Sequence, residues 1–247
     1  MPKHETAIYY AADTRLEITS TELQANETFA RAKDLDLFDA TEEYRLYARA
    51  GSNCGLRHFY CRSKTTRALV QRGEISPEHN KRVESLMTQL AEPASSRFRF
   101  YSQNYRREER ELALVENYAW QKETVLIPNK DLRVRHDIFG MRAGRLGMSS
   151  INPWVAIEVI HHHYPSPASF SAMLALSEQI PLIIIFDHVA KTNFFLHIKP
   201  GIRRADRSDV RCIFYIFEGQ LWENEKPISP LPGVLEVGMK ELITKYA

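Results

Sequence analysis

Residues 154–188 read WVAIEVIHHHYPSPASFSAMLALSEQIPLIIIFDH, and this stretch decides the fold. Residues 154–160 are almost continuously apolar, which is typical of a strand buried on both faces. Residues 166–178 have a proline near their start and apolar residues at helical spacing, so they predict a helix. Residues 181–186 predict a second buried strand. A strand, a helix and a strand in this order form a crossover unit, which pairs the two strands in parallel.

The segments before this unit predict further strands and helices. Residues 123–127 and 132–139 are rich in branched side chains, and the turn-forming sequence PNKD between them predicts a hairpin. Residues 105–120 carry apolar side chains at helical spacing and predict a helix. After the crossover unit, residues 194–198 and 210–217 predict two more strands.

Residues 27–50 and 76–91 also predict helices, the second beginning with the capping sequence SPEH. Residues 92–96 (EPASS) break the composition and mark the expected domain boundary. We therefore expect an α/β protein with a mainly helical N-terminal region, 1–92, and an α/β core domain, 93–247, whose mixed sheet contains the crossover unit.

Composition excludes some classes of protein. The chain has 247 residues, with 33 basic and 31 acidic side chains and a formal net charge of +2, so no overall field points to a nucleic-acid or membrane partner. We expect a cytoplasmic protein, because neither a signal-peptide pattern nor an apolar run of membrane-spanning length is present. Cys54, Cys61 and Cys212 are too few and too scattered for a disulfide framework and are expected to be reduced.

Two acidic residues stand out in the predicted sheet. Asp137 lies near the end of one strand, and Glu158 interrupts the apolar run of the next. Two carboxylates on neighbouring strands suit Mg²⁺, or Mn²⁺, which completes its shell with water and phosphate oxygens. The alternative is that Asp137 is solvated and that Glu158 pairs with Arg133 or Arg135.

Two stretches of this sequence resemble the PD-(D/E)XK nuclease-like superfamily, in particular its competence CoiA-like branch. They are residues 122–140, KETVLIPNKDLRVRHDIFG, and residues 154–164, WVAIEVIHHHY. Upstream, His58-Phe59 and Glu78-His79 are similar to two further elements of that branch. The resemblance implies a helix–strand–strand–strand–helix–strand core that binds Mg²⁺ and cleaves DNA. It also implies that Asp137 and Glu158 are the metal-binding and catalytic acids. Glu84 and Glu116 are both candidates for the acid of the first core helix.

The sequence departs from the family pattern at one important position. The family has a lysine or glutamine two residues after its glutamate, and this chain has Ile160 there, which cannot donate a hydrogen bond. His161 and His162 follow directly, and strand alternation would place His162 on the face of Glu158. Either histidine is then a candidate catalytic base, and the alternative is a solvated strand end.

Several weaker candidates remain. Arg133, Arg135, Arg203 and Arg204 lie in basic stretches and are the expected contacts to nucleic acid, although such stretches are more often solvated surface. Asp187-His188 follows the second strand of the crossover unit, at the edge where α/β sites tend to lie. The spacing of Cys54, His58 and Cys61 fits no common zinc site, so buried free cysteines are favoured there.

The sequence thus predicts a metal-dependent nuclease-like protein that hydrolyses DNA phosphodiester bonds. The alternative is an inactive nuclease fold that binds nucleic acid or blocks a protein partner, and Ile160 motivates it. A third hypothesis is a metal-dependent hydrolase of a small substrate that uses the three consecutive histidines, 161–163.

Overall fold

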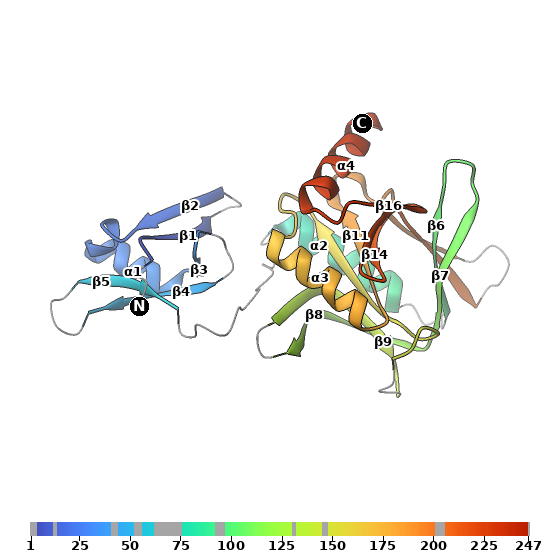
Figure 1. The fold of residues 1–247 in the computed structure, drawn as a ribbon, viewed down its shortest axis with the longest axis horizontal. Coiled ribbons are helices and arrows are strands. Elements are labelled where there is room, and N and C mark those ends of the chain that lie inside the picture. The colour runs from blue at the N-terminus through green and yellow to red at the C-terminus, as the bar shows by residue number, and fades with distance from the viewer. Residues whose placement is uncertain are drawn as a thin grey trace. The chain divides into compact units, whose positions relative to one another are not determined.

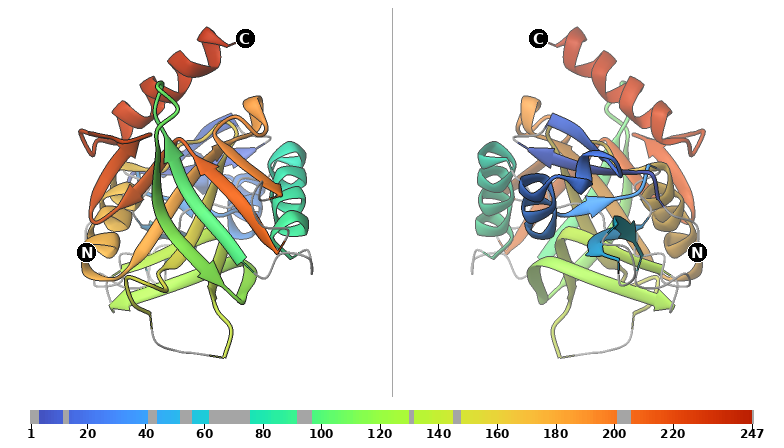
Figure 2. Two further views of the ribbon diagram at one scale, coloured as in Figure 1. Left: turned by 90° about the vertical axis from the view of Figure 1, so that its right-hand side faces the viewer. Right: turned by 90° about the vertical axis from the view of Figure 1, so that its left-hand side faces the viewer.

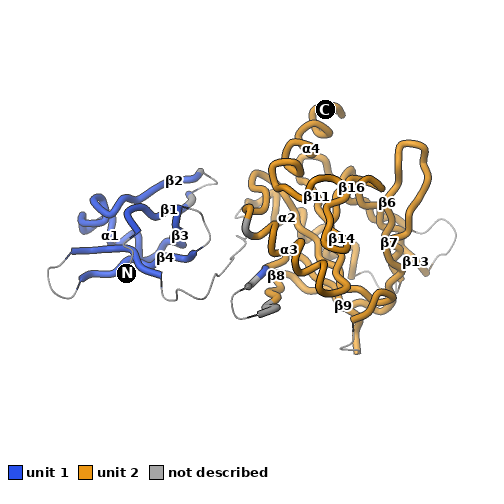
Figure 3. The backbone as a smooth tube through the Cα atoms, in the orientation of Figure 1, with its two compact units in different colours: residues 1–72, 127–134 blue, residues 73–126, 135–247 orange. Residues whose placement is uncertain are grey.

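The structure is a computed structural model that describes residues 4–11, 14–40, 44–51, 56–61, 76–91, 97–129, 132–144, 148–200 and 206–246 (Figure 1). In this part of the chain it is a mixed α/β protein with four α-helices and three β-sheets. It divides into two compact units: unit 1 contains residues 1–72 and 127–134, and unit 2 contains residues 73–126 and 135–247 (Figure 3). None of the described helices has the length and apolar character that a bilayer span requires.

Unit 1 is built mainly of strands. Its five-stranded sheet has the order β2-β1-β3-β4-β5, and its elements are β1 (Thr6–Ala11), β2 (Thr14–Thr19), the 3-10 helix η1 (Glu22–Gln24), α1 (Asn26–Asp34), β3 (Leu37–Phe38), β4 (Arg45–Ala50) and β5 (Arg57–Tyr60). The core contains Tyr9, Ile18, Leu37 and Phe59, with Phe29 of α1 packed against it.

The prediction of a mainly helical N-terminal extension is therefore wrong. Of the described residues in 27–50, those after Asp34 are not helical, and they include β3 and β4. The reason is visible in β4, where Leu46 is buried and Ala48 packs against the same core, while Arg45 and Arg49 are exposed. Core contacts two residues apart are typical of a strand that has one covered face.

Unit 2 contains the other two sheets. A seven-stranded sheet has the order β16-β15-β14-β11-β10-β9-β8, and a four-stranded sheet has the order β12-β13-β6-β7. The elements are α2 (Pro77–Ala91), β6 (Arg97–Gln103), β7 (Glu109–Glu116), β8 (Tyr118–Asn129), β9 (Leu132–Arg142), β10 (Trp154–Ile160), α3 (Pro167–Gln179), β11 (Leu182–His188), the 3-10 helix η2 (Val189–Lys191), β12 (Leu196–Pro200), β13 (Arg207–Cys212), β14 (Phe214–Phe217), β15 (Gln220–Glu223), β16 (Lys226–Ile228) and α4 (Pro232–Lys245).

The predicted crossover unit is confirmed. Strands β10 and β11 pair in parallel from Trp154 opposite Leu182 to Ile160 opposite His188, with α3 between them in the sequence. The helix predicted at residues 76–91 is confirmed as α2. Residues 105–120, however, are not helical: 109–116 lie in β7 and 118–120 lie in β8. Ala113 and Val115 are buried while Leu114 between them is exposed, so the apolar residues follow the period of a strand rather than a helix.

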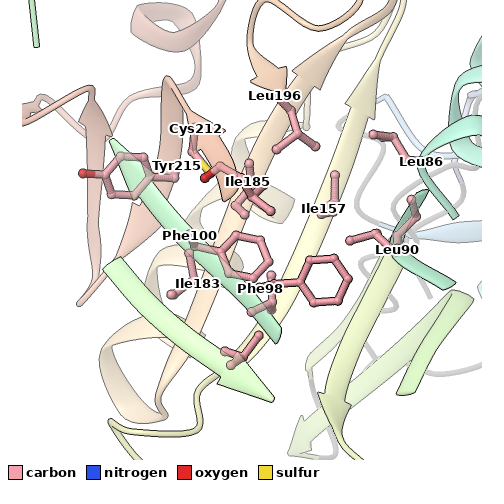
Figure 4. Packing of buried hydrophobic residues seen from close by; sticks show 14 of the residues in the cluster. Leu86, Leu90, Phe98, Phe100, Ile157, Ile183, Ile185, Leu196, Cys212 and Tyr215 are labelled. Atoms are coloured by element: carbon pink, nitrogen blue, oxygen red, sulfur yellow. The ribbon is translucent and has the colours of Figure 1, made fainter. Parts of the chain in front are cut away.

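The two faces of β10 and β11 are covered by different helices, which Figure 2 shows on opposite sides of these strands. Val155, Ile157, Val159, Ile183 and Ile185 form one core with Val83, Leu86 and Leu90 of α2 (Figure 4). On the other face, Phe186 stacks against Phe170 of α3 with 6.2 Å between ring centroids. Because side chains alternate along a strand, odd-numbered residues of both strands face α2 and even-numbered residues of β11 and β10 face α3.

The start of α3 is fixed by a capping residue. Ser166 Oγ accepts a hydrogen bond from the backbone N–H of Ser169 at 3.1 Å, and Pro167 follows as the first helical residue. We predict that Ser166→Ala lowers the free energy of unfolding by about 1 kcal/mol, because this N–H loses its acceptor. Ser171→Ala is the matched control, since Ser171 is exposed in the interior of the same helix. Equal midpoints for both variants in urea unfolding would contradict this role of Ser166.

Candidate functional site

Glu158 lies on the face of β10 that α3 covers. It is directly opposite Phe186, which packs on α3, and its side chain is 1% exposed. Its Oε1 atom forms a hydrogen bond with Nδ1 of the fully buried His136. The other ring nitrogen of His136, Nε2, is buried and has no hydrogen-bond partner among the described residues, and the ring stacks on Phe139. These contacts make Glu158 part of a closed pair inside the core.

Asp137 lies on the opposite side, toward α2. Its Oδ2 atom accepts a hydrogen bond from the backbone N–H of Val159 at 2.8 Å and lies 3.3 Å from Nε2 of the buried His79 of α2. Ile138 also faces α2, as a member of the core on that side. Two consecutive residues of β9 thus face the same helix, so the alternation of side chains is broken between Asp137 and Ile138.

The structure therefore does not bring Asp137 and Glu158 together. Each carboxylate has its own histidine partner, His79 of α2 for Asp137 and His136 for Glu158, and strand alternation in β10 directs Glu158 toward α3. This pair does not fit the shared Mg²⁺ site expected from the sequence, because both donors must lie on one side of a strand pair to hold one ion. Within the described ranges, no group of three or more His, Cys, Asp or Glu side chains could hold a metal ion.

A buried serine connects the start of α2 with the end of β10. Ser76 Oγ donates to Glu78 Oε2 at 2.9 Å, accepts from the backbone N–H of His79 at 3.3 Å, and lies 2.7 Å from His161 Nδ1. The pKa of Glu78 is lowered, first by a hydrogen bond from its own backbone N–H and then by the Ser76 hydroxyl. Glu78 is therefore a carboxylate that can only accept a hydrogen bond.

These contacts determine the proton positions around Ser76. A hydroxyl has one proton to donate and two lone pairs with which to accept. Ser76 donates its proton to Glu78 and uses one lone pair for the N–H of His79, so it can only accept from His161. His161 then carries its proton on Nδ1 when neutral, and Nε2 has the lone pair. The arrangement makes His161 a proton acceptor and leaves Ser76 unsuited to act as a nucleophile.

His161 lies directly after β10, at the carboxyl edge of the parallel strand pair. Its side chain is half-buried, whereas His162 and His163 are exposed. The rings of His161 and His162 are close, with 3.6 Å between their centroids. Of the two histidines predicted as bases, His161 is held by a hydrogen bond with Ser76, and it belongs with the α2 side rather than with Glu158.

Asp187 and His188 end the neighbouring strand β11. Arg82 of α2 donates from Nε to Asp187 Oδ2 at 2.5 Å and from a second nitrogen to the carbonyl of Leu196, and both side chains of the ion pair are buried. Burial raises the pKa of Asp187, while the charge of Arg82 acts in the opposite direction. Arg82 therefore ties α2 to the sheet beside the Ser76 network.

His188 is a neutral residue at this edge. Burial lowers its pKa to about 4, and positive charge on His161 and His162 acts in the same direction. Its Nδ1 atom accepts a hydrogen bond from the backbone N–H of Ala190 at 3.1 Å. The proton of neutral His188 therefore resides on Nε2, the opposite tautomer to that of His161.

The remaining candidates lie elsewhere or have other partners. Glu84 forms an ion pair with Lys122, and Glu116 forms one with Arg97, so neither acid contacts Asp137 in the described structure. Arg135 pairs with Glu123 at 3.1 Å. Cys212 is buried, and this burial raises the pKa of its thiol, while Cys61 is half-buried. The side chain of Arg133, and all of Arg203, Arg204 and Cys54, lie outside the described residues.

Three arginines of the four-stranded sheet have acidic partners. Arg97 contacts Glu116 at 2.6 Å, and Arg99 forms ion pairs with three acids, all on neighbouring strands. Arg207 contacts Asp209 of the same strand at 3.0 Å.

Three residues of this region, Ser76, His79 and Arg82, were not predicted as site residues. Ser76 and His79 were visible only as a helix start and as part of an element shared with the nuclease-like family. Their partners, His161 and Asp137, are 85 and 58 residues away in the sequence. Such long-range contacts depend on which face of the sheet α2 covers, and periodicity alone does not give that.

Comparisons of this chain with models of known protein families, with curated proteins and with solved structures each found no match.

The closed pair on the α3 side makes a prediction about stability. We expect Glu158→Ala to lower the free energy of unfolding by about 3 kcal/mol, because it leaves the buried His136 without a partner. Glu158→Gln should cost less, since its amide oxygen can still accept from His136. Glu84→Ala, which removes an exposed acid, is the control and should change stability by less than about 1 kcal/mol. A Glu158→Ala protein as stable as the control in urea would show that the pair does not support the core.

Proposed function

We propose that the chain is a nuclease-like hydrolase of nucleic-acid phosphodiester bonds in which His161 is the general base. The observation that carries this proposal is the hydrogen bonding of Ser76, which directs the lone pair of neutral His161 to Nε2. The substrate class comes from the sequence resemblance to the PD-(D/E)XK superfamily, and DNA is the expected substrate. In this proposal Asp137 positions the site, whereas Glu158 belongs to the core.

The proposed chemistry is the attack of water on phosphorus. His161 Nε2 takes one proton from the water as its oxygen forms a bond to phosphorus, and the bond between phosphorus and the leaving oxygen breaks. The leaving oxygen takes a proton from solvent. His161 stays oriented during the transfer because Ser76 holds its Nδ1–H, and Ser76 is in turn held by Glu78 and the first turn of α2.

Asp137 and His79 are positioning residues in this proposal. Asp137 Oδ2 accepts a hydrogen bond from the backbone N–H of Val159, two residues before His161, and also contacts the ring of His79. The backbone N–H of His79 in turn donates to Ser76 Oγ. One set of contacts therefore connects β9, β10 and the start of α2. The site lies at the carboxyl ends of parallel strands, where substrates of α/β proteins commonly bind.

Mg²⁺ or Mn²⁺ remains an expectation from the family resemblance alone. The two acids that would hold it lie on opposite sides of the sheet, so the proposed water activation assigns no step to the ion. Glu158 is assigned to the core and not to the site.

A second candidate function is a nuclease fold that binds nucleic acid without cleaving it. Two specific observations favour it: the family's lysine position is Ile160, which is buried, and Glu158 is closed off by His136. In that case the network around Ser76 only joins α2 to the sheet.

The proposal predicts the effects of substitutions on cleavage. With labelled single- and double-stranded DNA, we expect His161→Ala to reduce the cleavage rate by about 100-fold or more, because the general base is lost. Asp137→Asn should reduce it as well, since a weaker acceptor loosens the contacts to Val159 and His79. His163→Ala is the control, because His163 is an exposed neighbour with no role in the proposed reaction.

The same assay separates the alternatives. Activity that survives His161→Ala but is lost in a folded Glu158→Gln protein would contradict the proposed base and support the original assignment of Glu158. DNA binding without cleavage, in EDTA and with Mg²⁺ or Mn²⁺ alike, would support the second candidate function. Parallel unfolding curves for each variant show whether a loss of activity is a loss of folding.

A further inference from the structure

The N-terminal unit carries aromatic and basic side chains together on one face of strands β4 and β5. We define this aromatic face by Arg45, Tyr47 and Arg49 of β4 and His58 and Tyr60 of β5. None of these residues takes part in the network around His161, which belongs to unit 2.

The register of the two strands brings the side chains together. Tyr47 is directly opposite Tyr60, and Arg49 is directly opposite His58, in an antiparallel pair. Leu46, which alternates with these residues, points to the opposite face and belongs to the core under α1. The five residues of the aromatic face therefore share one side of the sheet.

The rings and the guanidinium groups contact one another. Tyr47 and Tyr60 have ring centroids 5.8 Å apart, and His58 and Tyr60 have centroids 6.5 Å apart. Arg45 lies over the Tyr47 ring at 5.6 Å, and Arg49 lies over the Tyr60 ring at 5.9 Å. Each tyrosine is thus combined with a cation above its ring, an arrangement that offers planar surfaces and positive charge at the same place.

The aromatic face lies beside a buried part of the same side of the sheet. On the neighbouring strands β3 and β1, Phe38 and Ile8 point to this side and are buried. In contrast, Tyr47, His58 and Tyr60 are half-exposed, and Arg45 and Arg49 are exposed. The aromatic face therefore presents three accessible rings on β4 and β5.

The charge of this region favours an anionic partner. Arg45 is neutralised in part by its ion pair with Asp36, whereas the described contact of the Arg49 guanidinium is with the Tyr60 ring. A ligand that presents flat rings and negative charge together is a nucleic-acid strand with unpaired bases.

We propose that the aromatic face is a binding site for single-stranded nucleic acid, with bases stacked on Tyr47 and Tyr60 and a phosphate held by Arg49. Paired bases are stacked within the duplex and do not present their faces, so the site should prefer single strands. The inference extends the proposed function, because it gives unit 1 the role of holding the substrate strand. It does not require that His161 catalyses hydrolysis.

The test measures the affinity of the full chain for a fluorescent oligothymidylate and for a duplex of equal length. We expect Tyr60→Ala and Tyr47→Ala each to raise the dissociation constant for the single strand by about 5- to 150-fold. This range corresponds to the loss of one stacking contact between a base and an aromatic ring. Tyr60→Phe and Tyr47→Phe keep the ring and should bind like the unmodified chain. Arg49→Ala should weaken binding and reduce its dependence on salt concentration.

Two results would overturn the proposal. One is unchanged affinity for the single strand in Tyr60→Ala and Tyr47→Ala proteins that unfold at the same urea concentration as the Phe variants. The other is a duplex bound more tightly than the single strand. Binding is measured separately from cleavage, so a chain that binds the single strand but cleaves no DNA would contradict the proposed function and leave this proposal intact.

Discussion

One buried hydroxyl, that of Ser76, determines how the candidate site is arranged. It caps the first turn of α2, donates to Glu78 and accepts from His161 at the end of β10, so all its hydrogen-bonding capacity is used. Because Ser76 itself is buried, leaving its hydroxyl without these contacts would cost free energy, and the arrangement is held together as a unit. The orientation and the tautomer of His161 both follow from it.

The two faces of β10 serve different purposes. Toward α3, Glu158 and His136 form a closed pair within an apolar environment, with Phe139 and Phe186 nearby. Toward α2, Asp137, His79, Ser76 and His161 form a connected set that reaches the half-exposed edge of the sheet. The separation of Asp137 from Glu158 follows from strand alternation in β10 and from the break in alternation at Asp137 in β9. It explains why the two acids have different histidine partners.

Much of the core of unit 2 was predictable, and the site was predictable only in part. The crossover from β10 to β11 was evident because two apolar runs flank a capped helix. The stretch 105–120 was misread because Leu112, Val115 and Ala119 also fit a helical period, whereas the pairing of β7 with β6 decided the outcome. Asp137 and His161 were identified as residues of interest, but their partners on α2 depend on tertiary packing. The strands of unit 1 were missed because short strands with one covered face carry a weak pattern.

The proton positions assigned to Ser76 and His161 can be tested through the tautomer of neutral His161. Long-range ¹H–¹⁵N correlation spectra of the ¹⁵N-labelled chain, recorded where the imidazole is uncharged, distinguish a protonated ring nitrogen from one with a lone pair. We predict that His161 carries its proton on Nδ1 and that Ser76→Ala removes this preference. A spectrum of the unmodified chain with the proton of His161 on Nε2 would contradict it, because the nitrogen assigned as the base would then have no lone pair.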